Sequence, residues 1–179
     1  MTLNDATALV IETQRLRLAL ESTESVLARI DALSPEDRAQ VSPDWLARMR
    51  RSSPTPWTHG FAIVERASGS SVGSCAFKGP PDEDGMVEIA YGIDVDHRGR
   101  GYAKEAAAAL VDFALRAGVR VVRAHTLAEN GASARVLVSC GFASVGEVID
   151  PEDGLVMRWE LGQPSDDRTG EGSGPRASA

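Results

Sequence analysis

The most informative stretch of this sequence, residues 88–103, reads Glu88-Ile89-Ala90-Tyr91-Gly92-Ile93-Asp94-Val95-Asp96-His97-Arg98-Gly99-Arg100-Gly101-Tyr102-Ala103. It passes from an apolar strand through a glycine-rich turn directly into a helical pattern. The first N–H groups of a helix have no partner within the helix, and the helix dipole adds partial positive charge there. Gly99 and Gly101 let the backbone approach an anion closely, while Arg98 and Arg100 add charge and donors. The stretch therefore predicts a phosphate or pyrophosphate site.

Two other phosphate-binding motifs fit this stretch poorly. The GxxxxGK[ST] pattern of a P-loop is not present in the sequence. A dinucleotide site is also disfavoured, because Lys104 stands where a third small residue is needed and Arg120 stands near the expected ribose-binding acid. The alternative of an ordinary strand-to-helix turn, in which the glycines only allow the backbone conformation, stays open at this point.

The rest of the chain predicts alternating strands and helices around this stretch. Hydrophobic periodicity indicates strands over residues 10–18, 61–66, 71–78, 86–95, 119–126, 145–149 and 155–161. Helices are expected from Ser22 or Thr23 to Leu33, from Ser42 onward, over residues 102–116 and over residues 133–139. Antiparallel strands come first and a strand–helix–strand crossover follows, so the expected class is α+β (mixed α/β).

Length and charge limit the classes of protein to consider. The chain has 179 residues and 42% hydrophobic residues, which favours one domain with one core, residues 1–161. A net charge of −7 argues against a nucleic-acid binder. No apolar run is long enough for a membrane span, and the first ten residues do not resemble a signal peptide, so a cytoplasmic protein is expected. Residues 162–179 lack large apolar side chains and are expected to be a disordered tail.

No cluster of His, Cys, Asp or Glu has the spacing of a metal site, so no metal is expected. Cys75 and Cys140 lie among apolar neighbours and are interpreted as buried thiols. His125 ends a predicted strand, where it is either a satisfied half-buried residue or a base. Trp45 and Trp57 are either core residues or part of the wall of an acceptor site.

A second segment, residues 124–142, allows the first one to be interpreted. Alone, Asn130 is interpreted as a turn residue and Ser133 as a helix cap. With the first segment, four motifs occur in order, and the sequence resembles the GCN5-related N-acetyltransferases, in particular the RimJ/RimL-like branch. The matching residues are Arg98-x-x-Gly101-x-Ala103, Glu88-Ile89-Ala90-Tyr91, Asn130-x-x-Ser133-x-Arg135-Val136-Leu137 with Gly141-Phe142, and Thr13-Gln14-Arg15-Leu16-Arg17-Leu18. The resemblance spans residues 11–161.

This resemblance implies a fold and a ligand. The fold is a twisted, mostly antiparallel sheet of about seven strands flanked by helices, with a V-shaped splay between the fourth and fifth strands, residues 88–95 and 119–126. Acetyl-CoA would lie in the splay, with its pantetheine amides on Ile93, Asp94 and Val95 and Asn130 near the pantetheine arm. Its pyrophosphate would lie on the N–H groups of Arg98, Gly99, Arg100, Gly101, Tyr102 and Ala103.

The resemblance also implies transfer of the acetyl group to a primary amine, at a protein N-terminus or in a small molecule, by direct attack in a ternary complex. Glu88 is the candidate base; the alternative is a structural acid that pairs with an arginine. Many relatives have a tyrosine seven residues after the asparagine as the acid toward the leaving thiolate, but this chain has Leu137 there. Ser133 or Ser139 could take that role, or the thiolate could leave without an acid.

A second class of function stays open beside the enzyme. A protein of this fold could hold acyl-CoA as a sensor or interaction module without turnover, and the missing tyrosine allows that reading. A homodimer is common in the branch that the sequence resembles. No nucleic-acid or membrane partner is expected.

Overall fold

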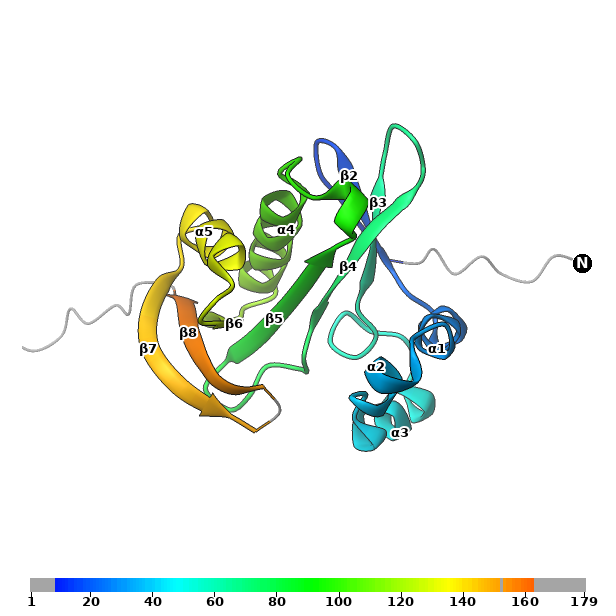
Figure 1. Ribbon diagram of the computed structural model, residues 1–179, viewed down its shortest axis with the longest axis horizontal. Coiled ribbons are helices and arrows are strands. Elements are labelled where there is room, and N and C mark those ends of the chain that lie inside the picture. Colours follow the sequence, from blue (N-terminus) through cyan, green and yellow to red (C-terminus); the bar gives the residue numbers. More distant parts are fainter. Residues whose placement is uncertain (1–8, 152, 163–179) are drawn as a thin grey trace, which may run out of the picture.

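The computed structural model describes residues 9–151 and 153–162, which form an eight-stranded sheet with helices on both faces (Figure 1). The strands are β1 (Val10–Glu12), β2 (Leu16–Leu20), β3 (Phe61–Glu65), β4 (Ser71–Phe77), β5 (Met86–Ile93), β6 (Val121–Leu127), β7 (Ala143–Asp150) and β8 (Gly154–Gly162). The helices are α1 (Thr23–Asp31), α2 (Pro35–Ala39), α3 (Pro43–Arg51), α4 (Tyr102–Arg116) and α5 (Gly131–Ser139), and a 3-10 turn, Val95–His97, follows β5.

The sheet order is β1-β2-β3-β4-β5-β6-β8-β7, and every neighbouring pair is antiparallel except β5 and β6. About seven strands were expected from the sequence. The difference arises because residues 10–18, predicted as one strand, are interrupted at Thr13, whose N–H donates to the carbonyl of Leu16 and whose Oγ1 accepts from Leu16 N–H. This local turn folds β1 back against β2.

The parallel pair β5 and β6 separates along its length. Pairing covers only Met86–Glu88 on β5 against Val121–Arg123 on β6. Beyond it β5 continues to Ile93 and stays paired with β4, while β6 continues to Leu127 and stays paired with β8. The two halves of the sheet therefore diverge after Glu88, at the place where the splay was predicted.

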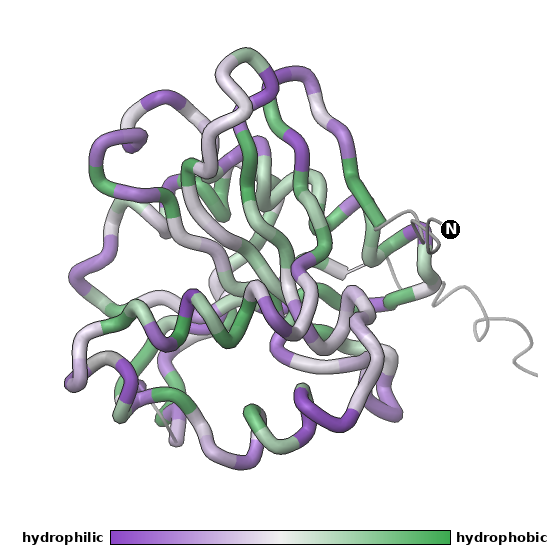
Figure 2. Tube along the Cα trace, turned by 90° about the vertical axis from the view of Figure 1, so that its right-hand side faces the viewer, coloured by the Kyte–Doolittle hydropathy of each residue, from purple (hydrophilic) through white to green (hydrophobic). Residues whose placement is uncertain are grey.

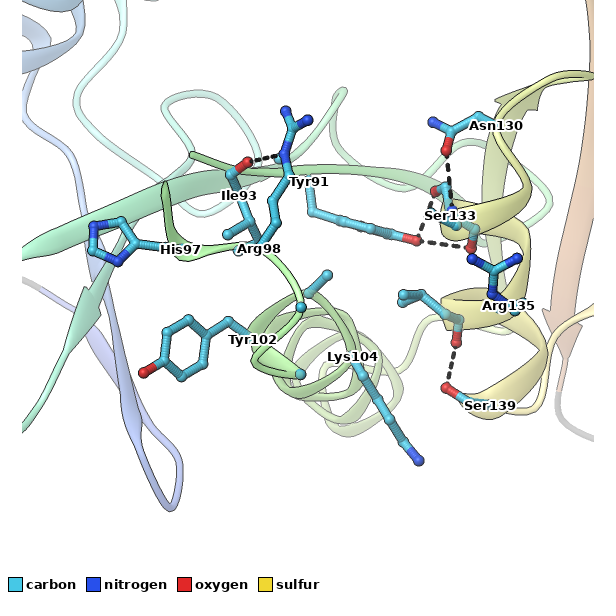
Figure 3. A pocket seen from close by; sticks show the side chains of 16 residues that line it. Tyr91, Ile93, His97, Arg98, Tyr102, Lys104, Asn130, Ser133, Arg135 and Ser139 are labelled. Atoms are coloured by element: carbon cyan, nitrogen blue, oxygen red, sulfur yellow. Dashed lines mark hydrogen bonds between the residues drawn. The ribbon is translucent and has the colours of Figure 1, made fainter. Parts of the chain in front are cut away.

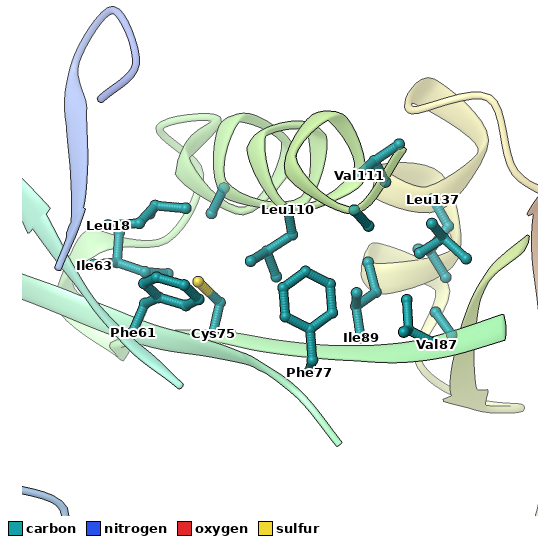
Figure 4. Packing of buried hydrophobic residues seen from close by; sticks show 14 of the residues in the cluster. Leu18, Phe61, Ile63, Cys75, Phe77, Val87, Ile89, Leu110, Val111 and Leu137 are labelled. Carbon is teal, nitrogen blue, oxygen red and sulfur yellow. The ribbon is translucent and has the colours of Figure 1, made fainter. Parts of the chain in front are cut away.

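The main core lies between α4 and the strands (Figure 4). Ala106, Leu110 and Ala114 of α4 are fully buried, and the small alanines allow the helix to lie close to the sheet. Phe61 and Phe77 face them from β3 and β4. Burial of a side chain such as Leu110 stabilises the fold by about 2 kcal/mol. In Figure 2 hydrophobic segments run through the central strands and hydrophilic segments recur in the outer loops.

A small second cluster holds α1 and α3 together through Val26, Ile30 and Met49. These helices lie on the face of the sheet opposite α4 (Figure 1). Ser22 and Ser42 cap them by accepting from Ser25 N–H and Trp45 N–H. The sequence predicted both caps, but α1 ends at Asp31 rather than Leu33, and α2 was not predicted.

Candidate active site

A cavity of about 550 Å³ lies between the end of β5, the glycine turn with the start of α4, and α5 (Figure 3). We call it the glycine-turn cavity. Its lining residues are Tyr91, Gly92, Ile93, His97, Arg98, Gly99, Gly101, Tyr102, Ala103, Lys104, Asn130, Ala132, Ser133, Arg135, Val136 and Ser139. It therefore lies in the region where β5 has parted from β6.

The turn presents unpaired backbone donors to this cavity. Among residues 9–151 and 153–162, no acceptor receives a hydrogen bond from the N–H groups of residues 99–104. Gly99 and Gly101 have φ values of 75° and 82°, which only glycine adopts without strain. A Cβ on Gly99 would point into open space, with no heavy atom within 4 Å. Consecutive N–H groups at a helix start form a site that favours an anion.

The edge of β5 that faces the splay offers further backbone groups. Asp94 N–H donates to Val72 O on β4 at 2.9 Å, so Ile93 and Tyr91, one and three residues earlier, direct their N–H groups to the opposite edge. The side chain of Arg98 bridges this edge to the turn, since its Nε donates to Ile93 O at 2.9 Å. An extended polar chain could pair with this edge.

Some residues assigned to the cofactor from the sequence have other roles. The N–H of Asp94 is used within the sheet, and the N–H of Arg98 donates to Val95 O at 3.3 Å. The N–H of Arg98 is therefore not free for the expected contact with the pyrophosphate, although the Arg98 side chain does line the cavity. The expected contact of the Asp94 backbone with the pantetheine amides stays a prediction. Asp94, Val95 and Arg100 are exposed and lie outside the lining. The 3-10 turn explains this, because it moves residues 94–96 away from the splay.

An ion pair fixes the start of α4. Glu105 accepts from Thr13 Oγ1 at 2.6 Å, from Arg15 N at 2.7 Å and from Arg15 Nε at 2.8 Å. Burial acts to raise the pKa of Glu105, but these hydrogen bonds outweigh it and hold that pKa below its usual value. Arg15 also donates to Arg100 O and lies 5.0 Å over the ring of Tyr102. The turn between β1 and β2 thus holds the glycine turn in place.

The α5 side of the cavity carries two hydroxyl groups. Asn130 caps α5, because its Oδ1 accepts from Ser133 N at 3.1 Å. The interpretation of Ser133 as the cap is therefore wrong, and its hydroxyl instead lies 3.0 Å from Tyr91 Oη (Figure 3). Ser139 donates its hydroxyl to Val136 O at 2.7 Å, within its own helix. Leu137, at the position of the missing tyrosine, is fully buried in the core.

Glu88 lies where β5 and β6 part, and it belongs to a chain of polar side chains outside the glycine-turn cavity. Its Oε1 accepts from Lys78 Nζ at 2.8 Å and lies 3.1 Å from His125 Nδ1. Arg158 Nε donates to His125 Nε2 at 3.2 Å, so that nitrogen carries no proton. His125 therefore donates from Nδ1 to Glu88. Of the two earlier interpretations, this contact pattern is that of a satisfied, half-buried histidine.

A trough lies on the opposite face of the sheet, between β4 and helices α1 and α3. Two adjoining hollows of about 290 and 300 Å³ form it, and they share Trp45, His59, Gly60 and Ala76. The smaller hollow also reaches Tyr91 and Gly92, which line the glycine-turn cavity as well. The same two residues of β5 therefore border both spaces.

The trough explains several residues whose roles the sequence left open. His59 is buried and bonded on both nitrogens, to Thr23 Oγ1 and Thr58 Oγ1 at 2.8 Å each, and burial lowers its pKa. Trp57 packs on Phe77 with ring centroids 4.7 Å apart, so it is a core residue, whereas Trp45 lines the trough. Burial raises the pKa of the Cys75 thiol to about 12, as expected for an inert thiol. Cys140 is only half-buried, contrary to expectation.

Comparison with known proteins identifies this arrangement. A family model described as an acetyltransferase (GNAT) domain matches residues 5–143. The chain belongs to this family. Its eight-stranded, mostly antiparallel sheet with flanking helices is the GNAT fold. The expected family and fold class are thereby confirmed.

Relatives of this GNAT domain include the uncharacterized N-acetyltransferase YjdG of Bacillus subtilis (strain 168), which is 38% identical over 89 residues. That match covers 48% of this chain and 53% of YjdG, so it spans about half the length of the relative. Among solved structures, the ribosomal-protein-S5-alanine acetyltransferase from Vibrio fischeri is similar with a TM-score of 0.66 and 14% identity, over 88% of this chain and 98% of that one.

A further similar structure is RimL, a ribosomal L7/L12 alpha-N-protein acetyltransferase in complex with coenzyme A. It has a TM-score of 0.66 and 18% identity, over 86% of this chain and 98% of that one. At such low identities these structures show the shared fold alone. Within residues 9–151 and 153–162, no helix is long and apolar enough to cross a membrane, and no group of three His, Cys, Asp or Glu could hold a metal ion.

Sequence reasoning missed several lining residues of the GNAT site. Tyr91, His97, Lys104 and Arg135 all line the glycine-turn cavity. The Nδ1 of His97 is buried and has no hydrogen-bond partner among the described residues. Tyr91 carried a detectable signal, because in the alternation of β5 it shares a face with the buried Val87 and Ile89.

Proposed function

We propose that this protein transfers the acetyl group of acetyl-CoA to a primary amine, at a protein N-terminus or in a small molecule, with both reactants bound at once. The observation that supports this most strongly is the position of the unpaired N–H groups of residues 99–104, which face a cavity at the splay of the sheet. Tyr91 and Gly92 border both that cavity and the trough. Two compartments that share the same strand residues as a border suit a reaction between two bound molecules.

The chain's residues fit the parts of acetyl-CoA. The N–H groups after Arg98 and the guanidinium of Arg98 suit the pyrophosphate, as anion donors at a helix start. The free edge at Tyr91 and Ile93 suits the pantetheine amides, and Asn130 lies on the far wall of the same cavity. When bound, acetyl-CoA would supply an acetyl group that is already activated as a thioester.

Glu88 is proposed as the base that takes the proton of the amine, directly or through water. Lys78 and His125 both contact its Oε1, and within residues 9–151 and 153–162 no side chain bonds its Oε2. Lys78 Nζ lies 2.8 Å from Oε1 and holds the carboxylate in place. A backbone N–H of the free β5 edge, near Ile93, is proposed to stabilise the developing oxyanion.

Ser133 is proposed to act toward the sulfur, since it lines the glycine-turn cavity and its hydroxyl is not used for capping. Ser139 is excluded from this proposal, because it donates its hydroxyl to Val136 O of its own helix. We further propose that the folded part is one functional unit and that the protein acts in the cytoplasm.

A thermal-shift titration with acetyl-CoA, coenzyme A and NAD in parallel tests the binding step. A ligand at about 100 times its dissociation constant adds about 2.7 kcal/mol of stability, which for a domain of this size raises the melting temperature by roughly 5–10 °C. We expect this rise with both coenzyme A compounds and none with NAD. The absence of a rise with millimolar coenzyme A would refute the proposal. A panel of primary amines and short peptides would then be screened for coenzyme A release.

One observation favours a second candidate, an acyl-CoA sensor without turnover. Leu137 fills the position of the usual catalytic tyrosine and is buried in the core, so that position offers no acid to a thiolate. Binding of acetyl-CoA without transfer to any amine in the panel would favour this candidate over the enzyme.

A further inference from the structure

We infer that Tyr91 positions the hydroxyl of Ser133 as a hydrogen-bond donor to the sulfur of the departing coenzyme A thiolate, given the acetyl transfer proposed above. The two residues come from opposite walls of the glycine-turn cavity, β5 and α5. Figure 3 shows the tyrosine ring extending from the strand so that its oxygen lies against the first turn of α5. The two residues are 42 positions apart in the sequence, so the fold brings them together.

The hydroxyl of Tyr91 has two oxygen atoms of Ser133 within reach. It lies 3.0 Å from Ser133 Oγ and 3.4 Å from the carbonyl oxygen of Ser133. Either of the two hydroxyl groups can donate to the other, and in the arrangement inferred here Tyr91 donates to the nearer Oγ, which leaves the serine hydrogen for the sulfur. Asn130 caps α5 through its contact with Ser133 N, so the serine hydroxyl is not used for capping.

Burial keeps Tyr91 in the donating form. Burial raises the pKa of its hydroxyl, although the hydrogen bond to Ser133 acts in the opposite direction. The tyrosine therefore remains protonated over the pH range in which amines can react. A serine hydroxyl rotates freely when it has no partner, so the contact from Tyr91 restricts it to the orientations that point away from the ring.

Tyr91 and Ser133 lie close to the position where many relatives have the tyrosine that acts on the leaving thiolate. Ser133 lies one helical turn before Leu137, where many relatives have their tyrosine, and both Tyr91 and Ser133 line the cavity. In the step concerned, the C–S bond breaks and its electron pair goes to sulfur, while the amide bond forms and Glu88 holds the proton from the amine. Ser133 donates a hydrogen bond to the sulfur without giving up its proton, and the thiolate takes a proton from solvent on release.

The experiment measures the bound thiol and requires no acceptor. Coenzyme A labelled with ¹³C at the carbon attached to sulfur is bound to the full chain, and its chemical shift is followed against pH. We expect the pKa of the bound thiol to lie below that of free coenzyme A in the native protein. Tyr91→Phe and Ser133→Ala should each raise this pKa by about one, and the double variant should raise it hardly further, since the two groups act in series.

The control is Ser144→Ala, which removes a hydroxyl group on β7, outside the cavity and the trough, and should leave the pKa of the bound thiol unchanged. A bound thiol whose pKa is the same in Tyr91→Phe as in the native protein would overturn the inference. If Tyr91→Phe does not fold, an unchanged pKa in Ser133→Ala has the same consequence. A labelled signal that never changes on addition of native protein would instead refute the proposed function, because coenzyme A would not be bound.

Discussion

The glycine-turn cavity and the trough are built in different ways. The cavity is formed by the end of β5, by α5 and by a run of residues within 98–104, whose backbone groups lie along one side. The trough is formed by side chains from α1, α3, the loop around His59, β4 and β5, which are far apart in sequence. Backbone donors recognise a ligand part that is the same throughout a family, whereas dispersed side chains can vary with the partner. Substitutions in the glycine-turn cavity should therefore affect coenzyme A binding, and substitutions in the trough should affect the acceptor.

The largest effect, a loss of turnover without a loss of coenzyme A binding, is expected from Glu88→Gln. The glutamine oxygen can still accept from Lys78 and His125, so the local contacts should persist, but the amide cannot take a proton. Turnover should fall by about a hundredfold or more, while the dissociation constant of coenzyme A changes less than about threefold. Steady-state kinetics and calorimetric titration measure the two quantities.

Glu160→Gln is the control for this prediction. Glu160 also forms an ion pair across neighbouring strands, accepting from Arg123 Nη2 at 2.6 Å, but it lies on β8, which does not pair with β5. We expect native turnover from it. Equal losses of turnover in Glu88→Gln and Glu160→Gln would show that Glu88 has a structural role in the sheet alone. Glu88 would then not be the base.

The contrast between the two sides also shows what a sequence can reveal. Helix α4 was predicted with its observed ends, Tyr102 and Arg116, because its alanine pattern and flanking glycines are local signals. The roles of Tyr91 and Ser133 depend on a contact between residues 42 positions apart, which no local pattern encodes. The same holds for His59, whose ring is bonded to Thr23 from another element. Asp94 was misplaced because the 3-10 turn after β5 has no distinctive sequence signal.

The second effect concerns the cavity and compares two glycines. Gly99 and Gly69 have φ values of 75° and 72°, and a Cβ on either would meet no heavy atom within 4 Å. Gly99→Ala and Gly69→Ala should therefore each lose about 1–2 kcal/mol of stability through the strained backbone. Only Gly99→Ala should also weaken coenzyme A binding, by about tenfold, since the added methyl group points toward the ligand space. Denaturant unfolding and calorimetric titration separate the two losses.

A tenfold loss of coenzyme A affinity in Gly69→Ala as well would mean that strain alone weakens binding. The prediction that Gly99 lies against bound coenzyme A would then be wrong. Turnover at saturating acetyl-CoA should be nearly native in both variants, because neither change touches the trough or Glu88.

A smaller effect is expected in the trough. Arg48 lines it, and within the part of the chain that the structure describes its guanidinium forms no ion pair. Arg48→Ala should change the KM of the acceptor by about threefold to tenfold and leave the KM of acetyl-CoA unaltered. Arg50→Ala, on the same helix but outside the trough, should change neither. An altered KM of acetyl-CoA in Arg48→Ala would show that the two sides are not separable.

The smallest effect on function is expected where the cavity is anchored, at Glu105. Glu105→Gln weakens the contacts to Thr13 and Arg15 and should cost about 1–2 kcal/mol of stability. Since the folded pKa of Glu105 lies below the usual value of 4.5, its contribution is fully present above pH 4.5 and is lost as the pH falls through the folded pKa. The difference in unfolding free energy between native protein and variant should therefore be constant near neutral pH and shrink below pH 4.5.

Asp112→Asn supplies the comparison for Glu105→Gln. Asp112 pairs with Arg116 on the same helix, but the side chains are 62% and 79% exposed, so its loss should change the unfolding free energy by less than about 0.5 kcal/mol at any pH. Denaturant unfolding at a series of pH values distinguishes the two variants. If Glu105→Gln matched Asp112→Asn, the turn between β1 and β2 would not hold the glycine turn. The unpaired N–H groups of the cavity would then owe their alignment to the glycines and α4 alone.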